Sequence, residues 1–492
     1  MPDFAFVGPS YEAPSIYQDA QESINFFAEA DPNKQPGERG IVALYPTPGL
    51  LLQTQLAIAE VRGLHTMSGE NILIAVAANI VYQVNTSMVA TQIGTLATSS
   101  GQVSISENIT TANGLIAYIV DGPNRYTWVV ATNTFTTLPT TDGPWTGATV
   151  ADNIDNYNIY NQPNSQNWAC TDLSSSLSTK ALYGSSDGSA DQLVTLIVDR
   201  RQVYLLGEVT TEVWVDVGNT IAGITTFPFQ RVPGTFSQSG CAAQYSVARV
   251  ADSFACVSRD TRGVAQIKLM QGYTWLRIST HAVEQSLIDQ VVEDAIAYTY
   301  QIEGHEMYVV TFPSVGVNGL TWVFDTSTKA WHKWLSWDSN NAVYTRHRSN
   351  CGAYFNNMYI VGDYQNGKLY SVENAVYTED GATIRRLRRA PHITNNLQRQ
   401  YFESFQIQFQ PGVGLSTGQG SDPQAMLRWS SDGGSTWSSE YWVTIGQIGA
   451  YANRALWRRL GQSRDRIFEV VVSDPIKAVI ISAELKSEVG EN

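Results

Sequence analysis

The sequence predicts an all-β protein: a β-propeller with an extended N-terminal arm and a C-terminal β-sandwich. Short apolar runs alternate with charged or glycine turns, as in Leu193–Val198, Val203–Leu206 and Glu212–Val215, and such runs are typical of consecutive antiparallel strands. The pattern recurs at intervals of 43 to 51 residues. Charged residues make up 15% of the chain, aromatic residues 11%, and there are 38 glycines, a balance that favours short strands joined by many turns.

The chain of 492 residues is long enough to divide into domains. We expect three parts: an extended arm over residues 1–55, a propeller over 56–376, and an arginine-rich sandwich over 377–492.

The first 50 residues have no clear period, and one apolar cluster lies at Ile24–Phe27. A segment rich in proline tends to be extended. We expect an arm that packs along its own domain or a neighbouring subunit, the alternative being a poorly ordered terminus. The prolines are Pro2, Pro9, Pro14, Pro32, Pro36, Pro46 and Pro48.

The repeats begin near residues 61, 104, 149, 194, 245, 295 and 344. Each unit offers about four strands, and propeller repeats have periods of roughly 40 to 50 residues with four strands per blade. Seven units predict a seven-bladed propeller. A blade cannot bury both faces alone, so each must pack against its neighbours.

The character changes after about residue 376. Residues 385–466 contain eleven arginines, no lysine and five acidic residues, a local balance of +6 in a chain of net charge −14. This asymmetry indicates a separate domain with its own partner surface, and Phe402–Gln410 alternates as a sandwich strand does.

The candidate interface consists of arginines in this domain. The alternatives for the run at 385–389 are a phosphate or DNA contact, a solvated strand edge, or pairing with acids of an adjacent subunit. The interface candidates are Arg385, Arg386, Arg388, Arg389, Arg458 and Arg459.

One motif resembles the Asp-box of sialidases and related β-proteins. In that motif the aspartate caps a tight hairpin, glycine allows the turn and tryptophan packs beneath it. We interpret it as structural. A sialidase would also need an arginine cluster for a carboxylate and a Tyr/Glu nucleophile pair, and no spacing ties the arginines of this domain to such a pair. Its residues are Ser430, Asp432, Gly434, Thr436 and Trp437.

Other chemistry is not indicated. The six histidines have no metal-ligand spacing, and neither GxSxG nor a P-loop occurs, so we expect no catalytic residue, metal or cofactor. The acidic balance argues against bulk electrostatic binding of nucleic acid or an anionic membrane. Four widely spaced cysteines predict free thiols in a reducing compartment. No leader or membrane-spanning run is seen.

Several motifs resemble the "packaged DNA stabilization" family of podoviruses, the tail hub or nozzle proteins of short-tailed phages of the Salmonella lambdoid type. The resemblance is densest over residues 45–285 and weakest over 85–190. Its motifs are Tyr45–Leu50, Val61–His65, Leu205–Glu208, Thr211–Trp214, Phe227–Gly234, Ser239–Ala243, Ser258–Gly263, Gly272–Glu284 and Ala455–Gly461.

The resemblance implies a non-enzymatic virion protein of the phage tail, assembled in the host bacterial cytoplasm. It implies a hexameric ring below the portal and its adaptor, a tail needle that plugs the ring, and tailspikes or fibres beside it. The ring would retain packaged double-stranded DNA and conduct it during ejection without sequence-specific binding. The alternatives are a glycan-binding tail protein and, on the Asp-box alone, a glycosidase.

Overall fold

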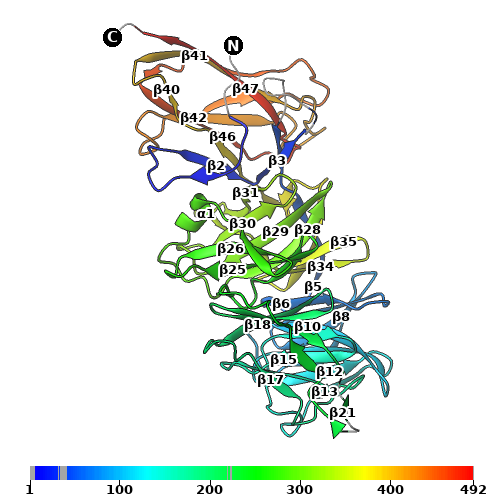
Figure 1. The fold of residues 1–492 in the computed structure, drawn as a ribbon. Helices are drawn as coiled ribbons and strands as arrows, with labels where there is room; N and C mark the ends of the chain where they lie inside the picture. The colour runs from blue at the N-terminus through cyan, green and yellow to red at the C-terminus, as the bar shows by residue number, and fades with distance from the viewer. Residues whose placement is uncertain (1–5, 32, 34–41, 219, 222–223, 491–492) are drawn as a thin grey trace.

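The computed structural model describes residues 6–31, 33, 42–218, 220–221 and 224–490. These residues form a disc of blades and a sandwich beside its rim, and Figure 1 shows the sandwich at one end of an elongated molecule. The fold is all-β as predicted: the described residues contain one short helix, α1 (His281–Gln285).

Seven antiparallel four-stranded units form the propeller, and their first strands begin close to the seven positions expected from the sequence. The seven-bladed propeller is therefore confirmed. The blades are β6 (Val61–Thr66), β7 (Ile72–Ala77), β8 (Ile80–Asn85), β9 (Ala90–Thr95); β10 (Ser104–Thr110), β11 (Gly114–Val120), β12 (Arg125–Val129), β13 (Thr134–Thr137); β14 (Ala151–Ile154), β15 (Tyr157–Asn161), β16 (Asn167–Cys170), β17 (Tyr183–Ser185); β18 (Leu193–Asp199), β19 (Gln202–Gly207), β20 (Thr211–Asp216), β23 (Phe229–Arg231); β24 (Ala248–Val250), β25 (Ser253–Arg259), β26 (Ala265–Gln271), β27 (Thr274–Arg277); β28 (Ile296–Ile302), β29 (His305–Phe312), β30 (Leu320–Asp325), β31 (Ala330–Lys333); and β34 (Ser349–Phe355), β35 (Met358–Asp363), β36 (Lys368–Glu373) with β5 (Gly49–Gln55).

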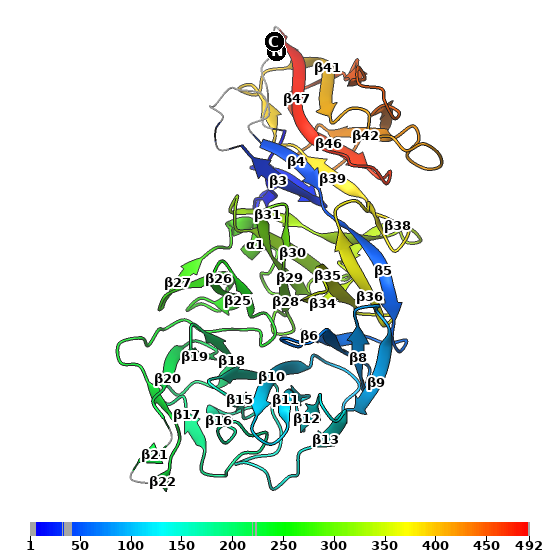
Figure 2. The ribbon, with the colours of Figure 1, turned by 90° about the vertical axis from the view of Figure 1, so that its right-hand side faces the viewer.

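The seventh blade takes its outer strand from the N-terminal segment, because β5 pairs antiparallel with β36 over six residue pairs. Figure 2 shows the two strands side by side, β5 in blue and β36 in yellow. Gly49 opens β5 where a Cβ atom would lie 2.4 Å from the carbonyl oxygen of Val376, so no larger residue fits there. This pairing joins the first strands of the chain to the last blade and so closes the ring of blades.

The sandwich consists of two sheets, and both contain strands from each end of the chain. One sheet continues directly from β31 of the sixth blade through the parallel strand β2. Its strands are β1 (Tyr11–Glu12), β2 (Ala20–Ile24), β39 (Arg386–Arg389), β40 (Ile393–Thr394), β46 (Asp465–Val472), β42 (Gln424–Ser430) and β43 (Tyr441–Thr444). The other sheet contains β3 (Phe26–Ala30), β4 (Val42–Pro46), β47 (Ile480–Val489), β41 (Gln400–Phe409), β44 (Ala455–Arg458) and β45 (Gln462–Ser463).

Short hairpins lie outside these sheets or at their margins. The hairpin of β32 and β33 packs against the sandwich, where Leu335 and Tyr344 contact Leu387 and Val471. The remaining short strands are β21 (Thr220–Ile221), β22 (Ile224–Thr225), β32 (Leu335–Asp338), β33 (Val343–Arg346), β37 (Thr378–Glu379) and β38 (Ala382–Thr383).

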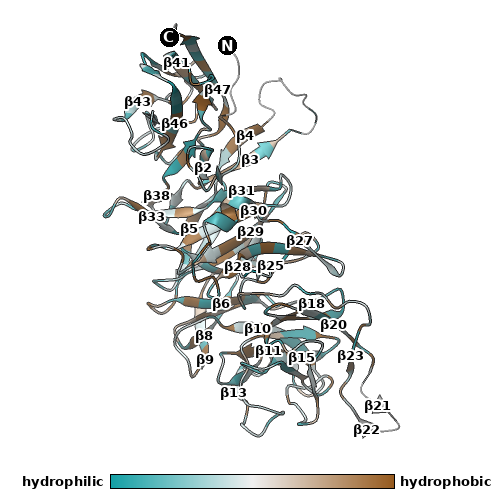
Figure 3. Cartoon of the chain, turned by 60° about the vertical axis from the view of Figure 1, so that its left-hand side comes forward, coloured by the Kyte–Doolittle hydropathy of each residue, from teal (hydrophilic) through white to brown (hydrophobic). Residues whose placement is uncertain are grey.

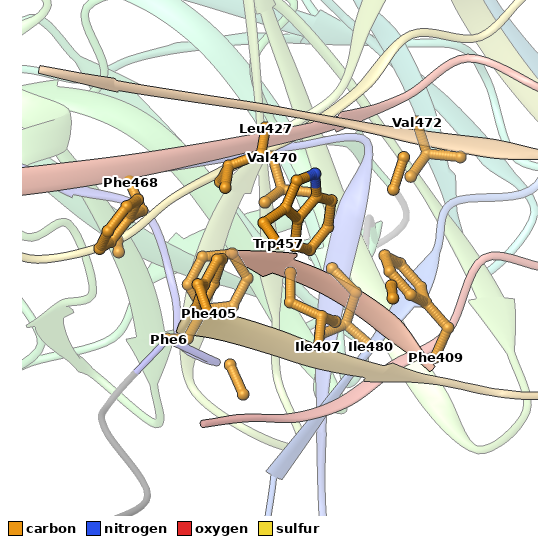
Figure 4. Packing of buried hydrophobic residues seen from close by; sticks show 14 of the residues in the cluster. Phe6, Phe405, Ile407, Phe409, Leu427, Trp457, Phe468, Val470, Val472 and Ile480 are labelled. Carbon is orange, nitrogen blue, oxygen red and sulfur yellow. The ribbon is translucent and has the colours of Figure 1, made fainter. Parts of the chain in front are cut away.

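Apolar side chains from the N-terminal segment lie inside the sandwich. Phe6 and Phe26 are buried in the same cluster as Phe405 and Trp457, and the ring centroids of Phe6 and Phe405 are 5.5 Å apart. Figure 4 shows Phe6 against Phe405, with Phe468 and Trp457 nearby. Figure 3 shows that hydrophobic and hydrophilic residues share the same strands in both parts of the molecule, the alternation expected of sheets that bury one face more than the other.

The N-terminal segment therefore packs against the rest of its own chain, since its strands join sheets of both the sandwich and the propeller. The first five residues, together with residue 32 and residues 34–41, which include Pro2, Pro32 and Pro36, lie outside the described residues. The domain limits 1–55, 56–376 and 377–492 stay a prediction.

We expect Phe26→Ala to lower the free energy of unfolding by about 3 to 5 kcal/mol, because the substitution removes a large buried side chain and leaves a cavity in the core. Chemical denaturation followed by circular dichroism measures the change. Val317→Ala is the control, since Val317 is 99% exposed and should shift stability by less than about 0.5 kcal/mol. Equal effects of the two substitutions would show that the N-terminal strand contributes nothing to the core.

Candidate functional site

The clustered arginines at 385–389 lie at the junction of sandwich and propeller. Arg388 is fully buried and its guanidinium donates to the backbone oxygens of Phe6 (2.5 Å) and Pro9 (2.9 Å) and to Oε1 of Gln21 (2.7 Å). Burial lowers the pKa of Arg388 to about 9. Arg386 is also buried, and its guanidinium donates to the carbonyl of Tyr377 at 3.4 Å. Arg388 thus anchors the N-terminal segment, and Arg386 anchors the interdomain segment, the residues between β36 and β39.

Arg385 and Arg389 are partly buried and also have partners within the chain. Arg385 donates to the hydroxyl of Tyr344 at 2.8 Å and its guanidinium lies 4.8 Å from the ring centre of Trp337. Arg389 binds Glu469 through Nη2 at 2.8 Å. The side chains that hold the run in place thus come from the β32–β33 hairpin and from β46 of the sandwich.

A network of partly buried charges, centred on the buried Glu469, surrounds Arg389. Glu22 of β2 binds Lys333 Nζ at 2.6 Å and Arg389 Nη1 at 3.2 Å. Burial opposes the ionisation of Glu22, but the charges of Lys333 and Arg389 outweigh it and lower its pKa to about 2. Glu469 binds Arg428 as well, at 2.5 Å. The network joins the sixth blade to the sandwich, and every charge in it has an opposite partner.

Asn25 completes the junction at the bend between β2 and β3. It is buried with φ of 58°, a conformation that asparagine tolerates better than most residues. Its side-chain NH₂ donates to the carbonyls of Leu335 (2.8 Å) and Arg385 (2.9 Å), and its side-chain oxygen accepts from the N–H of Leu335 at 2.9 Å. Its own N–H donates to the carbonyl of Lys333. Sequence reasoning missed Asn25, Glu22 and Lys333, because their partners are hundreds of residues away.

The two remaining interface candidates, Arg458 and Arg459, are exposed at the end of β44. Neither forms an ion pair with any residue that the structure describes. Arg386 and Arg388 are not on a surface that a partner could reach, so the interface prediction now rests on Arg458 and Arg459 and stays a prediction.

The Asp-box residues form the turn between β42 and β43. The Asp432 carboxylate accepts from Thr436 N–H (2.8 Å), Thr436 Oγ1 (2.6 Å) and Ser430 Oγ (2.7 Å), and these bonds lower its pKa to about 2. Gly434 has φ of 98° and donates its N–H to Ser430 Oγ at 2.8 Å. Trp437 lies over the guanidiniums of Arg389 and Arg428, at 5.0 and 4.8 Å from its ring centre.

A cavity of about 420 Å³ lies on the propeller axis, lined by residues from the first strand of each blade. Tyr245, which precedes the fifth blade, donates its hydroxyl to the carbonyls of Thr149 (3.0 Å) and Gln102 (3.4 Å). These residues precede the third and second blades, so the Tyr245 side chain crosses the axis. Gln244 also binds Thr149. Burial raises the pKa of Tyr245 to about 12, and the axis is closed at this face.

Metal and thiol chemistry has little support in the described residues. No group of three or more His, Cys, Asp or Glu side chains among them is arranged to hold a metal ion. All four cysteines are free, and Cys170, Cys241 and Cys256 are buried. Burial raises the pKa of Cys170 and Cys351 above the usual thiol value, which leaves those thiols protonated and unreactive at neutral pH.

Comparison with models of protein families shows the family to which the chain belongs. Residues 22–377 match the family model "Bacteriophage P22 Gp10, beta-propeller", and residues 385–488 match "Bacteriophage P22 Gp10, beta-sandwich". The chain belongs to the bacteriophage P22 Gp10 family. It is therefore a structural component of a phage tail that assembles with other virion proteins, and the Gp10 models name both of its parts as the sequence predicted.

Other comparisons add little. A crystal structure of the N-terminal domain of Nup159 matches with a TM-score of 0.39 and 9% identity, over 72% of this chain and 98% of the Nup159 chain. No curated protein matches the chain in sequence. Within the described part of this Gp10 relative, no helix is long and apolar enough to cross a membrane.

Glu22→Gln should lower the free energy of unfolding by about 3 kcal/mol at pH 7, because it removes the carboxylate charge that pairs with Lys333 and Arg389. The pKa of Glu22 is depressed in the folded state, from 4.5 to about 2, so its contribution is present above pH 4.5 and is lost as pH falls toward 2. The stability difference between wild type and variant should shrink across that window, measured by denaturation at each pH. Glu208→Gln, at an exposed site, is the control, and a pH-independent difference would contradict the argument.

Arg388→Ala should lower stability by at least about 3 kcal/mol, because the substitution leaves several buried backbone carbonyls without donors. Arg459→Ala should change it by less than about 0.5 kcal/mol, since that side chain is exposed. Thermal and chemical denaturation of the pair measure the contrast. Two small effects would mean that Arg388 does not hold the N-terminal segment.

Proposed function

We propose that six copies of this protein form a ring below the portal–adaptor complex of a short-tailed phage. The ring retains packaged DNA and conducts it during ejection. Its partners are the portal–adaptor proteins and a tail needle, spikes or fibres, and double-stranded DNA passes through the lumen without sequence-specific contacts. Copies assemble in the bacterial cytoplasm, in keeping with four free cysteines.

The closed propeller axis is the observation that carries this proposal. Tyr245 crosses the axis and the cavity there measures about 420 Å³, which is far too small for a DNA duplex. A DNA passage must therefore lie between copies. Heterologous contacts between identical copies close into rings with cyclic symmetry, which provides such a passage.

The charge and rigidity of the chain support the same function. A net charge of −14 repels phosphates, so DNA would slide along the walls without adhering. The continuous sheet from the sixth blade into the sandwich, together with the ion network at the junction, makes each copy a stiff wall element.

The alternatives have less support. A glycan-binding surface is expected to carry clustered exposed tryptophans, whereas Trp442, at 57%, is the one exposed tryptophan among the thirteen, all of which are described. A glycosidase would need a free acid, but the Asp432 carboxylate is engaged by its own turn.

The mass of the purified protein, alone and mixed with its portal–adaptor complex, tests the proposal. We expect a species of six copies of 54.1 kDa, either free or bound to the portal–adaptor complex, measured by native mass spectrometry. A monomer or trimer that ignores the portal and binds host polysaccharide would overturn the ring and favour the glycan-binding alternative.

A further inference from the structure

A pocket of about 900 Å³ lies on the propeller between the sixth and seventh blades. Glu303 of the turn between β28 and β29 and Glu306 of β29 line it, and Tyr354 and Tyr359 come from β34 and β35. Figure 1 shows β34 and β35 projecting beside β28. No lysine or arginine is among the described residues that line the pocket.

The lining has the chemistry that recognises a guanidinium. Tyr354 is 53% exposed, and its ring centroid lies 4.8 Å from that of Tyr359, so aromatic faces are available for cation–π contact. Glu303 is exposed and forms no ion pair with a described residue. Glu306 uses one carboxylate oxygen to accept the N–H of Ala251 at 3.0 Å, and its other oxygen accepts no hydrogen bond from a described residue.

His305 does not cancel this negative charge. Its Nδ1 lies 2.7 Å from Asp325 Oδ2 and its Nε2 binds Glu29. The hydrogen bond to Asp325, with help from Glu29, raises the pKa of His305 to about 9 despite its burial. The imidazolium therefore faces two carboxylates of its own, and the charges of Glu303 and Glu306 remain available to a ligand.

The chain itself carries the matching cations. Arg458 and Arg459 are exposed and have no acidic partner among the described residues. Glu403 and Glu488 line the same hollow as Arg459, and Glu403 forms an ion pair with Lys486 rather than with either arginine. Arg458 and Arg459 of two copies would repel each other, because like charges repel. An acidic surface is the complement they need, and the pocket beside β28 is such a surface.

One chain cannot make this contact with itself. Glu29, which binds His305 at the pocket, lies on β3, and Arg458 lies on β44. These strands are the two edges of one sheet, in the order β3-β4-β47-β41-β44, and four strand spacings separate them by roughly 19 Å. The donor strand β44 thus lies at the far edge of the sheet from β3, the strand that contacts the pocket, and a contact between two different surfaces of identical copies links them head to tail and can close into a ring.

We propose that Arg458 and Arg459 of one copy bind in the acidic tyrosine pocket, formed by Glu303, Glu306, Tyr354 and Tyr359, of the next copy. The contact rests on the proposed ring and names two surfaces that build it. Arg and Tyr side chains are the types that carry most of the energy of protein interfaces.

Charge reversal from either side tests the contact. Glu303→Arg and the double variant Arg458→Glu with Arg459→Glu should each weaken ring formation at least tenfold, measured by native mass spectrometry in the presence of the portal–adaptor complex. Mixing the two variant proteins should restore a six-copy ring with three copies of each, because every junction then pairs opposite charges. Glu208→Arg and Arg262→Glu, at exposed sites elsewhere, are the controls, and unchanged thermal unfolding verifies that every variant is folded.

Each outcome decides between the two proposals. Six-copy rings that each reversed variant forms as readily as the wild type would overturn this contact and leave the ring standing. Loss of rings without recovery on mixing would also overturn it, since the two surfaces then act on different partners, as would a Glu303→Arg ring that no longer binds the portal–adaptor complex. A wild-type protein that remains monomeric would overturn the ring and this contact together.

Discussion

The architecture depends on one buried bend. Asn25 sits in a left-handed conformation between β2 and β3, so that the chain leaves one sheet of the sandwich and enters the other. A bend inside a core needs a partner for each backbone and side-chain polar group, and Asn25 finds them in Lys333, Leu335, Arg385 and Thr47. These partners belong to the sixth blade, the segment after it, the interdomain segment and the approach to β5. A single residue thus fixes where four separate parts of the chain meet.

Both lobes consequently depend on the same N-terminal strands. β5 closes the ring of blades, while β2, β3 and β4 complete the two sheets of the sandwich. Neither lobe has a complete set of strands without this segment, and the sheet that runs from β31 into β2 leaves no flexible linker on that side of the junction. The charges of Glu22, Lys333 and Arg389, all partly buried, and of the buried Glu469 add specificity, because a shifted junction would leave a charge unpaired away from water.

Patterns confined to short stretches were predictable from the sequence. The blades recur because each buries its faces against its neighbours, so their starts appear as a period in the sequence. The Asp-box hairpin is closed by hydrogen bonds from Ser430 and Thr436 to Asp432, all within seven residues. The assignment of β5 and of the strands before it was not predictable, since β5 pairs with β36 more than 300 residues away and its own pattern is weak. Composition likewise could not separate the buried Arg388, held by Phe6 and Pro9, from the exposed Arg459.

That separation gives the arginine-rich sequence two distinct uses. Arg386 and Arg388 are desolvated, and burial costs them part of their basicity, to pKa values of about 10 and 9; the charge is tolerated because backbone carbonyls surround it. Arg458 and Arg459 are exposed and form no ion pair with a described residue, and such side chains contribute little to folding. Charges that do not stabilise the chain are free to select what binds to it. In a chain of net charge −14, an exposed arginine pair favours an acidic protein surface over DNA only where geometry presents such a surface. In the proposed ring, identical copies would present it at a fixed distance.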